Sequence, residues 1–218
     1  MDNDETISGP VVISIADCED QLAEAKVVDD LAFRDHQGIT MDELRSIMHH
    51  GFVALLSLSG QLVAESQVVM ERVDHLNWEL PRKAAFCYGI AVHPQFQGRG
   101  LGKLLLREHE NIAARRGALD MFTTIRVENA PSIKLFVKAG HKVIDYIPFY
   151  GEEKEGHRLL LGRSLAYEEQ QCTYRESALA PVIFGDKVDP AAHEAINRLI
   201  VAGFVGTSIT DRGIHFCR

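Results

Sequence analysis

The chain alternates between two hydrophobic periods, one typical of strands and one typical of helices. Short runs rich in apolar and β-branched residues predict strands over 11–16, 52–57, 62–70, 84–92, 121–127, 142–147 and 158–165. Apolar positions three or four residues apart predict helices over 17–33, 40–50, 103–116 and 130–139. The order of these elements predicts a mixed α/β (α+β) fold, with helices flanking a central sheet.

The expected helix ends carry residues that commonly cap helices. Asp17 is placed to cap the first helix, and Thr40 with Glu43 forms a capping-box pattern at the start of the second. Pro131 suits the first turn of the fourth helix, and Gly140 suits its C-terminal cap. These residues support the helix boundaries that the hydrophobic period predicts.

A glycine-rich turn, Gln97-Gly98-Arg99-Gly100-Leu101-Gly102, separates a predicted strand from a predicted helix. Glycines accept positive φ and let consecutive backbone N–H groups converge, and the following helix adds the positive end of its dipole. A mononucleotide loop is excluded, because Gln97 stands where its first glycine is needed and Leu104 where its Ser or Thr is needed. A dinucleotide fingerprint is excluded because its third glycine would fall on Lys103. The turn therefore predicts a site for a different diphosphate.

The pattern Gln-x-x-Gly-x-Gly, after a strand that ends Ile90-Ala91-Val92-His93-Pro94, resembles the acetyl-CoA-binding core of the GCN5-related N-acetyltransferases. The resemblance is clear over about 52–165, diffuse over 11–51 and absent beyond 165. It implies a splayed mixed sheet, with a bulge in strand 84–92 that lets this strand and the next one part around a thioester. The two helices before residue 51 would help to wall the acceptor pocket.

The resemblance implies acetyl-CoA as co-substrate and assigns residues to it, with no metal. Backbone groups of Ile90, Ala91 and Val92 would bind the acyl carbonyl and the pantetheine amides. The diphosphate would lie on the turn and the start of its helix, formed by Gln97, Gly98, Arg99, Gly100, Leu101, Gly102 and Lys103. Asn129 matches a family residue that contacts the pantetheine arm, and the alternative is that it only caps the helix that follows.

Direct attack of an amine on the thioester requires a group that removes the amine's proton. Glu71 is a candidate base, as are Glu65, Asp74 and His75, but no motif singles out any of them. For each of the four, the favoured alternative is a solvated surface residue.

The departing thiol is the point at which this sequence differs from many members of the family. Phe136 occupies the position of their proton-donating Tyr and cannot donate. Tyr88 is a candidate replacement, since it would share a face with Ile90 in a regular strand. Tyr150 and Tyr146 are further candidates, and for all three the favoured alternative is a half-buried aromatic residue that lines a pocket or the core. His93 is expected to be a surface group of its loop.

Composition and charge restrict the remaining functions. The formal net charge of −8 argues against nucleic-acid binding and favours cationic acceptors such as amines. The acidic N-terminus and the lack of a long apolar run predict a cytoplasmic protein without a membrane anchor. The four cysteines, Cys18, Cys87, Cys172 and Cys217, have no paired spacing and are expected to be reduced thiols. A thiol near the thioester keeps an acylated Cys87 as an alternative route.

The sequence divides into a polar tail over 1–10, an acetyltransferase domain over 11–165 and a small αβ extension over 166–218. In the extension, Asp189 and Pro190 open an amphipathic helix that ends at Gly203. Short runs at 181–184, 204–209 and 214–217 predict strands. The extension would cover the core, or would exchange between subunits of a homodimer.

The function predicted from the sequence is acetyl transfer from acetyl-CoA to a primary amine, preferably of a small molecule, by direct attack in a ternary complex. Two alternatives stay open. One is an acetyltransferase for amines of peptides or proteins, and the other is a noncatalytic acyl-CoA-binding or sensing protein.

Overall fold

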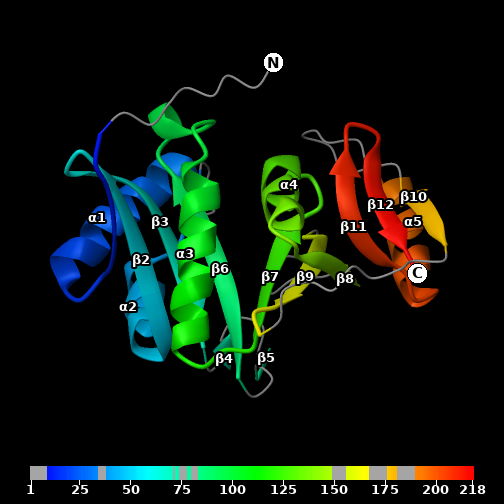
Figure 1. Ribbon diagram of the computed structural model, residues 1–218, viewed down its shortest axis with the longest axis horizontal. Coiled ribbons are helices and arrows are strands. Elements are labelled where there is room, and N and C mark those ends of the chain that lie inside the picture. Colours follow the sequence, from blue (N-terminus) through cyan, green and yellow to red (C-terminus); the bar gives the residue numbers. More distant parts are fainter. Residues whose placement is uncertain are drawn as a thin grey trace. The chain divides into compact units, whose positions relative to one another are not determined.

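The computed structural model describes residues 9–33, 38–70, 72–73, 78–79, 83–148, 156–166, 176–180 and 190–218. Its contacts divide the chain into two compact units (Figure 1). The first comprises residues 1–73 and 79–118, and the second comprises residues 74–78 and 119–218. Two short strands, β4 (Arg72–Val73) and β5 (Trp78–Glu79), lie at the first of these boundaries.

The first unit contains a sheet in the order β1-β2-β3-β6, with every neighbouring pair antiparallel. Its strands are β1 (Val11–Ile15), β2 (Gly51–Leu58), β3 (Gln61–Val69) and β6 (Ala84–Val92). Its helices are α1 (Glu19–Ala32), α2 (Met41–His50) and α3 (Leu101–Arg115), and the 3-10 turn η2 (Pro94–Phe96) precedes α3. These elements confirm the predicted ones, although α3 begins two residues earlier than the hydrophobic period indicated.

The two faces of this sheet carry different helices. Val53 and Leu55 of β2 belong to a buried cluster with Leu22 of α1 and Leu44 of α2. The alternate residue Phe52 faces the other way, where the guanidinium of Arg116, at the end of α3, lies 4.9 Å from its ring centroid. Helices α1 and α2 therefore cover one face of the sheet and α3 covers the other.

The prediction that Asp17 caps α1 is wrong. The N-cap residue is Cys18, whose side chain makes no capping hydrogen bond. The Asp17 N–H instead donates to Oε1 of Gln21, at 2.9 Å. The predicted capping box of α2 is confirmed, with Thr40 Oγ1 accepting from the Glu43 N–H at 3.2 Å.

The second unit contains a sheet in the order β7-β9-β8-β11-β12-β10, again with antiparallel neighbours. Its strands are β7 (Asp120–Arg126), β8 (Lys142–Ile147), β9 (Arg158–Ser164), β10 (Ser177–Ala180), β11 (Val205–Thr210) and β12 (Gly213–Cys217). Its helices are α4 (Ala130–Lys138) and α5 (Pro190–Val201). The extension thus continues the sheet through one backbone register pair, Gly206 with Val143.

The predicted helix and the last two predicted strands of the extension are confirmed as α5, β11 and β12. Strand β10 was not predicted. The strand expected at 181–184 and the cap residue Asp189 lie outside the described residues. Among the described helices, none has the length and apolar character needed to cross a membrane.

Candidate functional site

Strand β6 carries a β-bulge at Tyr88. In its register with β3, Gly89 is opposite Gln67 and Cys87 is opposite Val68, so Tyr88 has no opposite residue. An extra residue of this kind interrupts the ladder locally and bends its strand. The bulge expected within 84–92 is therefore present.

The bulge also changes where Tyr88 points. Ile90 is opposite Ser66, whose Oγ lies 3.1 Å from Nδ1 of His109 on α3. Tyr88 packs against the apolar cluster of α1 and α2 instead, and its OH donates to Oε1 of Glu43 at 2.9 Å. The expectation that Tyr88 and Ile90 share a face is wrong, because it assumed an unbroken pleat.

The glycine-rich turn joins β6 to α3 in the first unit. Gly98 and Gly100 both have φ of +77°, the left-handed region that favours glycine. Gln97 fixes the start of the turn, since its Nε2 donates to the carbonyl oxygen of Val92 at 3.0 Å. Gly100 is the N-cap of α3, so Leu101, Gly102 and Lys103 form the first helical turn.

The N-terminus of α3 has the properties that an anion requires. Its N-cap makes no side-chain hydrogen bond, and its first turn contains no acidic residue. Apart from each glycine's own chain neighbours, no described residue lies within 4 Å of a Cβ built on Gly98 or Gly100, so the space over both glycines is open. Backbone N–H groups and the helix dipole at such a terminus bind phosphate, and a diphosphate therefore fits this turn.

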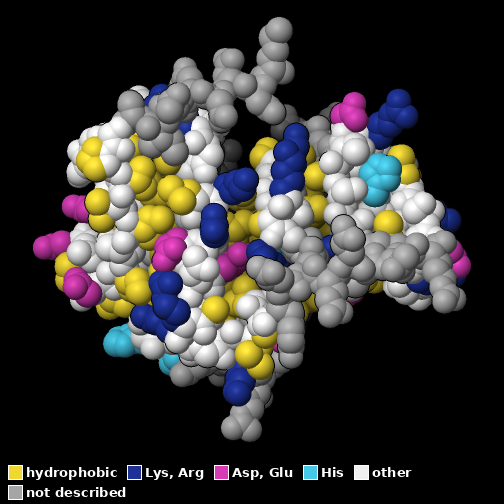
Figure 2. Space-filling view, in the orientation of Figure 1, with side chains coloured by type: hydrophobic (Ala, Val, Ile, Leu, Met, Phe, Trp, Pro, Cys, Tyr) yellow, Lys and Arg dark blue, Asp and Glu magenta, His cyan; other side chains and the backbone are white. Residues whose placement is uncertain are grey.

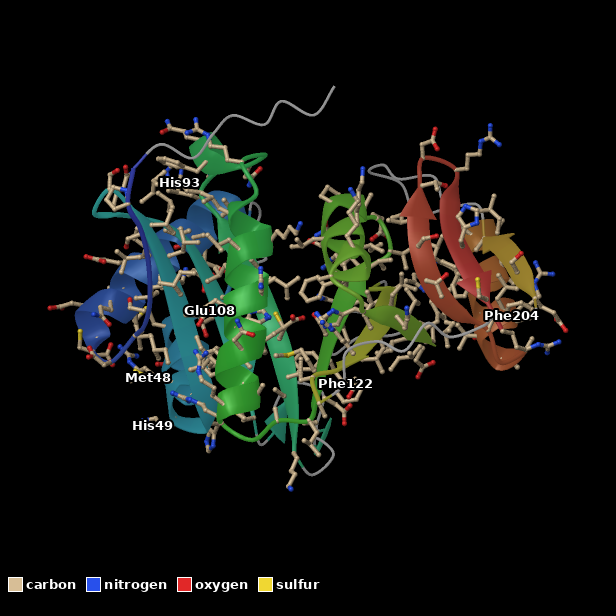
Figure 3. The ribbon with its side chains drawn as sticks, viewed as in Figure 1. Met48, His49, His93, Glu108, Phe122 and Phe204 are labelled. Carbon is tan, nitrogen blue, oxygen red and sulfur yellow. The ribbon has the colours of Figure 1, made fainter. Side chains whose placement is uncertain are left out.

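Side chains around the turn add positive charge and rigidity. The Arg99 guanidinium lies 5.4 Å from the Phe96 ring centroid, and Lys103 is in the first turn of α3. Figure 2 shows both basic and acidic side chains over α3. His93 lies beside the turn (Figure 3), where its Nδ1 accepts from the Gln95 N–H at 3.2 Å. This contact gives His93 a local structural role in its loop.

Asn129 is the N-cap of α4 in the second unit, and its Oδ1 accepts from the Ser132 N–H at 3.2 Å. The capping role that the sequence left open is therefore present. Contact with a pantetheine arm stays a prediction.

Two of the three tyrosines considered as proton donors can be placed in the structure. The OH of Tyr146 is hydrogen-bonded to Nδ1 of His157, and burial raises the pKa of Tyr146 to about 12. Tyr88 is bonded to Glu43 as described above. Tyr150 lies outside the described residues. Phe136 is buried against the ring of His141, with centroids 5.0 Å apart.

Of the candidate bases, Glu71, Asp74 and His75 lie outside the described residues. Glu65 is fully buried on β3, and burial together with the nearby Asp29 raises its pKa well above the ordinary range. Cys87 is also fully buried, and burial followed by the charges of Glu110 and Glu65 raises the pKa of its thiol. Neither side chain is an exposed, ionised group.

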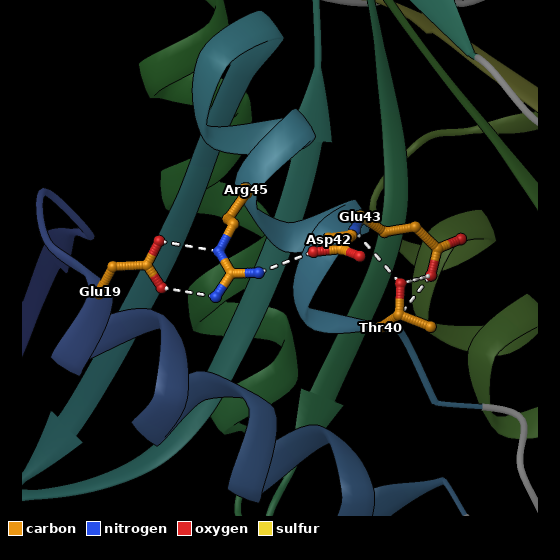
Figure 4. A network of polar contacts seen from close by, with 5 residues as sticks. All are labelled: Glu19, Thr40, Asp42, Glu43 and Arg45. Atoms are coloured by element: carbon orange, nitrogen blue, oxygen red, sulfur yellow. Dashed lines mark hydrogen bonds and ion pairs between the residues drawn. The ribbon is translucent and has the colours of Figure 1, made fainter.

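Three polar residues on the α1 and α2 face were missed by the sequence analysis as site residues: Asp29, Glu43 and Gln67. Glu43 was recognised only for its cap, which Figure 4 shows with the neighbouring ion pairs of Arg45 to Glu19 and Asp42. Asp29 and Gln67 had no signal in the sequence, because their proximity arises from the packing of α1 on β3.

Comparison with known proteins identifies the family. The model of the acetyltransferase (GNAT) family matches residues 21–141, more than half of the chain. The chain belongs to the GNAT family. The match includes the glycine-rich turn and the end of β6 before it, on which the sequence resemblance rested, together with α3 and Asn129.

One curated relative of this chain is the ribosomal protein bS18 alanine N-acetyltransferase of Salmonella typhimurium. It is 33% identical over 73 residues, which cover 34% of this chain and 49% of the relative. The chain thus aligns with about half the length of the curated relative.

Two solved structures have the same GNAT fold. The Escherichia coli ribosomal-protein-S18-alanine N-acetyltransferase superposes with a TM-score of 0.56 at 18% identity, covering 76% of this chain and 100% of that chain. The Salmonella typhimurium protein YncA, solved with its cofactor acetyl-CoA, gives a TM-score of 0.55 at 21% identity, covering 74% and 96%. At these identities the two structures bear on the fold alone.

Proposed function

We propose that this protein is an acetyl-CoA-dependent N-acetyltransferase that transfers an acetyl group to a primary amine. The observation that carries the proposal is the turn at the start of α3, with two left-handed glycines and an uncapped, acid-free helix N-terminus. Such a terminus fits the diphosphate of coenzyme A. Family membership supports the same donor.

The residues assigned to acetyl-CoA divide by role. Gly98, Gly100 and the first turn of α3 hold the diphosphate through backbone N–H groups, and Arg99 with Lys103 adds charge. The bulged segment that continues to Ile90, Ala91 and Val92 directs backbone groups of β6 to the acyl carbonyl. Asn129 is proposed to contact the pantetheine arm. When bound, acetyl-CoA supplies an activated acyl group on a thioester.

Direct attack by the amine is the proposed route. A covalent route would need an ionised, accessible thiol, and Cys87 is buried with a raised pKa. Its Sγ–H donates to the carbonyl oxygen of Gly89 at 3.7 Å. Glu71 and Tyr150 stay candidates for the proton transfers.

The acceptor is proposed to be the amine of a small molecule in a cytoplasmic setting. A second candidate is the N-terminal amine of a protein, because the name of the curated relative specifies a protein alanine. The 11–165 acetyltransferase domain is proposed as the part that carries the activity, and a homodimer is the proposed assembly.

Replacing Gly100 by Val tests the donor site. Valine strains the left-handed N-cap by about 1–3 kcal/mol and withdraws the N–H groups, so acetyl-CoA binding measured by calorimetry should be lost. Gly60→Val is the matched control, since Gly60 has φ of +82° and equally open space, in the turn between β2 and β3. Equal affinity of acetyl-CoA for both variants would reject the assignment of the turn.

Thiol release from acetyl-CoA with a panel of amines tests the reaction. The panel contains small mono- and diamines and an alanine-started peptide with a free N-terminus. Amine-dependent release supports the enzyme, and the better acceptor distinguishes the two candidate substrates. Tight acetyl-CoA binding without release at any pH from 7 to 9, a range over which amines lose protons, would favour the noncatalytic alternative.

A further inference from the structure

The carboxylate of Glu43 is held in one orientation beside the bulge of β6. Its Oε2 accepts from the Thr40 N–H at 2.8 Å and from the Thr40 hydroxyl at 2.7 Å. Its Oε1 accepts from the Tyr88 OH at 2.9 Å. The capping box and the bulge therefore fix the two oxygens from opposite sides, which a solvated surface glutamate would not require.

The surroundings of this pair are apolar on one side and accessible on the other. Tyr88, Met41 and Met48 pack against the buried cluster of α1, α2 and β2. Glu43, Tyr88 and Gly89 are nevertheless only partly buried. A carboxylate at the border of an apolar cluster interacts more strongly with a cation than one in bulk water does.

Two further carboxyl groups, those of Asp29 and Glu65, are buried on this face. Burial raises the pKa of both groups, and Gln67 Nε2 donates to Glu65 Oε1 at 2.6 Å. Glu65 Oε2 is buried and has no hydrogen-bond partner within the part of the chain that the structure describes. The Lys and Arg side chains of α1 and α2 pair with other carboxylates, Lys26 with Asp30 and Arg45 with Glu19 and Asp42.

The Gln67 side chain of this network packs against the backbone that follows the bulge. Oε1 of Gln67 lies 2.6 Å from the position of a Cβ built on Gly89, so the amide fills the space over this glycine. The backbone of β6 after Tyr88 therefore packs against Gln67, which is hydrogen-bonded to Glu65. Glu43 contacts Tyr88, the bulged residue itself.

We propose that Glu43 and Tyr88 form the subsite for the acceptor, and that this subsite binds a primary ammonium group. This inference rests on the proposed acetyltransferase function. Glu43 binds the ammonium through Oε1, and Tyr88 is a positioning residue that orients the carboxylate. A free amine and a protein N-terminus present the same group, so the chemistry of recognition is shared by both candidate acceptors.

Equilibrium binding to the CoA-saturated protein tests the subsite without turnover. The probes are 1,3-diaminopropane, an alanine-started tetrapeptide and the N-acetylated form of the same peptide. Wild type should bind at least one ammonium probe and should not bind the acetylated peptide through this site. Which probe binds distinguishes a small acceptor from a peptide acceptor.

Glu43→Gln should weaken ammonium binding about tenfold or more, because a charge-assisted hydrogen bond is lost. Glutamine keeps the capping box, so α2 and the thermal stability should be retained. Asp42→Asn is the matched control. It removes the same charge from the neighbouring residue, whose carboxylate faces Arg45 and not Tyr88. Tyr88→Phe should cost less than Glu43→Gln, and the double variant should lose no more than Glu43→Gln alone.

Three results would overturn the subsite: equal effects of Glu43→Gln and Asp42→Asn, additive losses in the double variant, or CoA binding with no ammonium binding by wild type. Failure of the proposed function has a different signature. In that case the wild-type protein would not bind CoA, or would bind acetyl-CoA without amine-dependent thiol release.

Discussion

At the scale of single residues, Asp29 provides a pH-dependent contribution to stability. Burial raises its pKa from 3.8 to about 6, against the opposing effects of the Ile39 N–H and Lys26. The folded state therefore binds more protons than the unfolded state between these two values. The free energy of unfolding should fall as pH rises from about 4 to about 6. Above that range, ionisation of Asp29 should cause no further loss in the free energy of unfolding.

Asp29→Asn should remove most of this slope, because an amide does not ionise. We expect urea unfolding to show that wild type loses about 1–2 kcal/mol more than Asp29→Asn between pH 4.5 and 7.5, with solvent screening allowed for. Asp30→Asn is the control, since Asp30 is the exposed neighbour that pairs with Lys26. A wild-type slope equal to that of Asp29→Asn would contradict the prediction.

The residues that could be predicted are those whose chemistry is local. Gly98 and Gly100 signal their backbone conformation by their identity, and Thr40 with Glu43 signals a cap by its spacing. The contact of Glu43 with Tyr88 joins residues 45 positions apart, and it depends on a bulge that displaces one side chain. Neither local spacing nor a regular pleat contains that information.

At the scale of elements, the hydrophobic period located every described helix and most described strands to within about two residues. Strand β10 was missed because Ser-Ala-Leu-Ala has no marked alternation and becomes a strand by pairing with β12. The boundary of α3 was displaced because Leu101 and Gly102 were counted with the turn. The start of α1 was misplaced because Asp17 has the chemistry of a cap without its position.

The attachment of β11 to β8 gives a prediction at this scale. A Cβ built on Gly206 lies 2.7 Å from Cβ of Val143, so Gly206→Val cannot be accommodated without moving one strand. We expect a loss of about 2 kcal/mol or more in the free energy of unfolding, measured with urea, from overpacking and the lost pairing.

Ser208→Val is the matched control for this substitution. Ser208 is exposed on the same strand, where a β-branched side chain suits the backbone and stability should change little. An unfolding free energy for Gly206→Val equal to that of the control would show that β11 does not approach β8 closely.

At the scale of the whole molecule, the contacts place the extension in the same unit as β7, β9 and β8. The extension supplies three of the six strands in that unit's sheet, β10, β11 and β12. A separate 166–218 domain stays a prediction. Sequence composition could not decide this, because a strand that extends a neighbouring sheet and a strand of an independent lobe have the same hydrophobic pattern.

The net charge of −8 acts on cationic acceptors before they reach the subsite. A negative field raises the local concentration of a cation, and the gain grows with the cation's charge.

Salt shortens the range of that field to about 10 Å at 0.1 M and less above it. Raising salt from about 0.05 to about 0.5 M should therefore lower kcat/KM more for 1,3-diaminopropane than for n-propylamine. Both amines present the same reacting group, so the ratio of their salt effects isolates the second charge. Equal losses for the two amines would mean that the protein's field does not steer its acceptor, and recognition would then rest on the contacts at Glu43 alone.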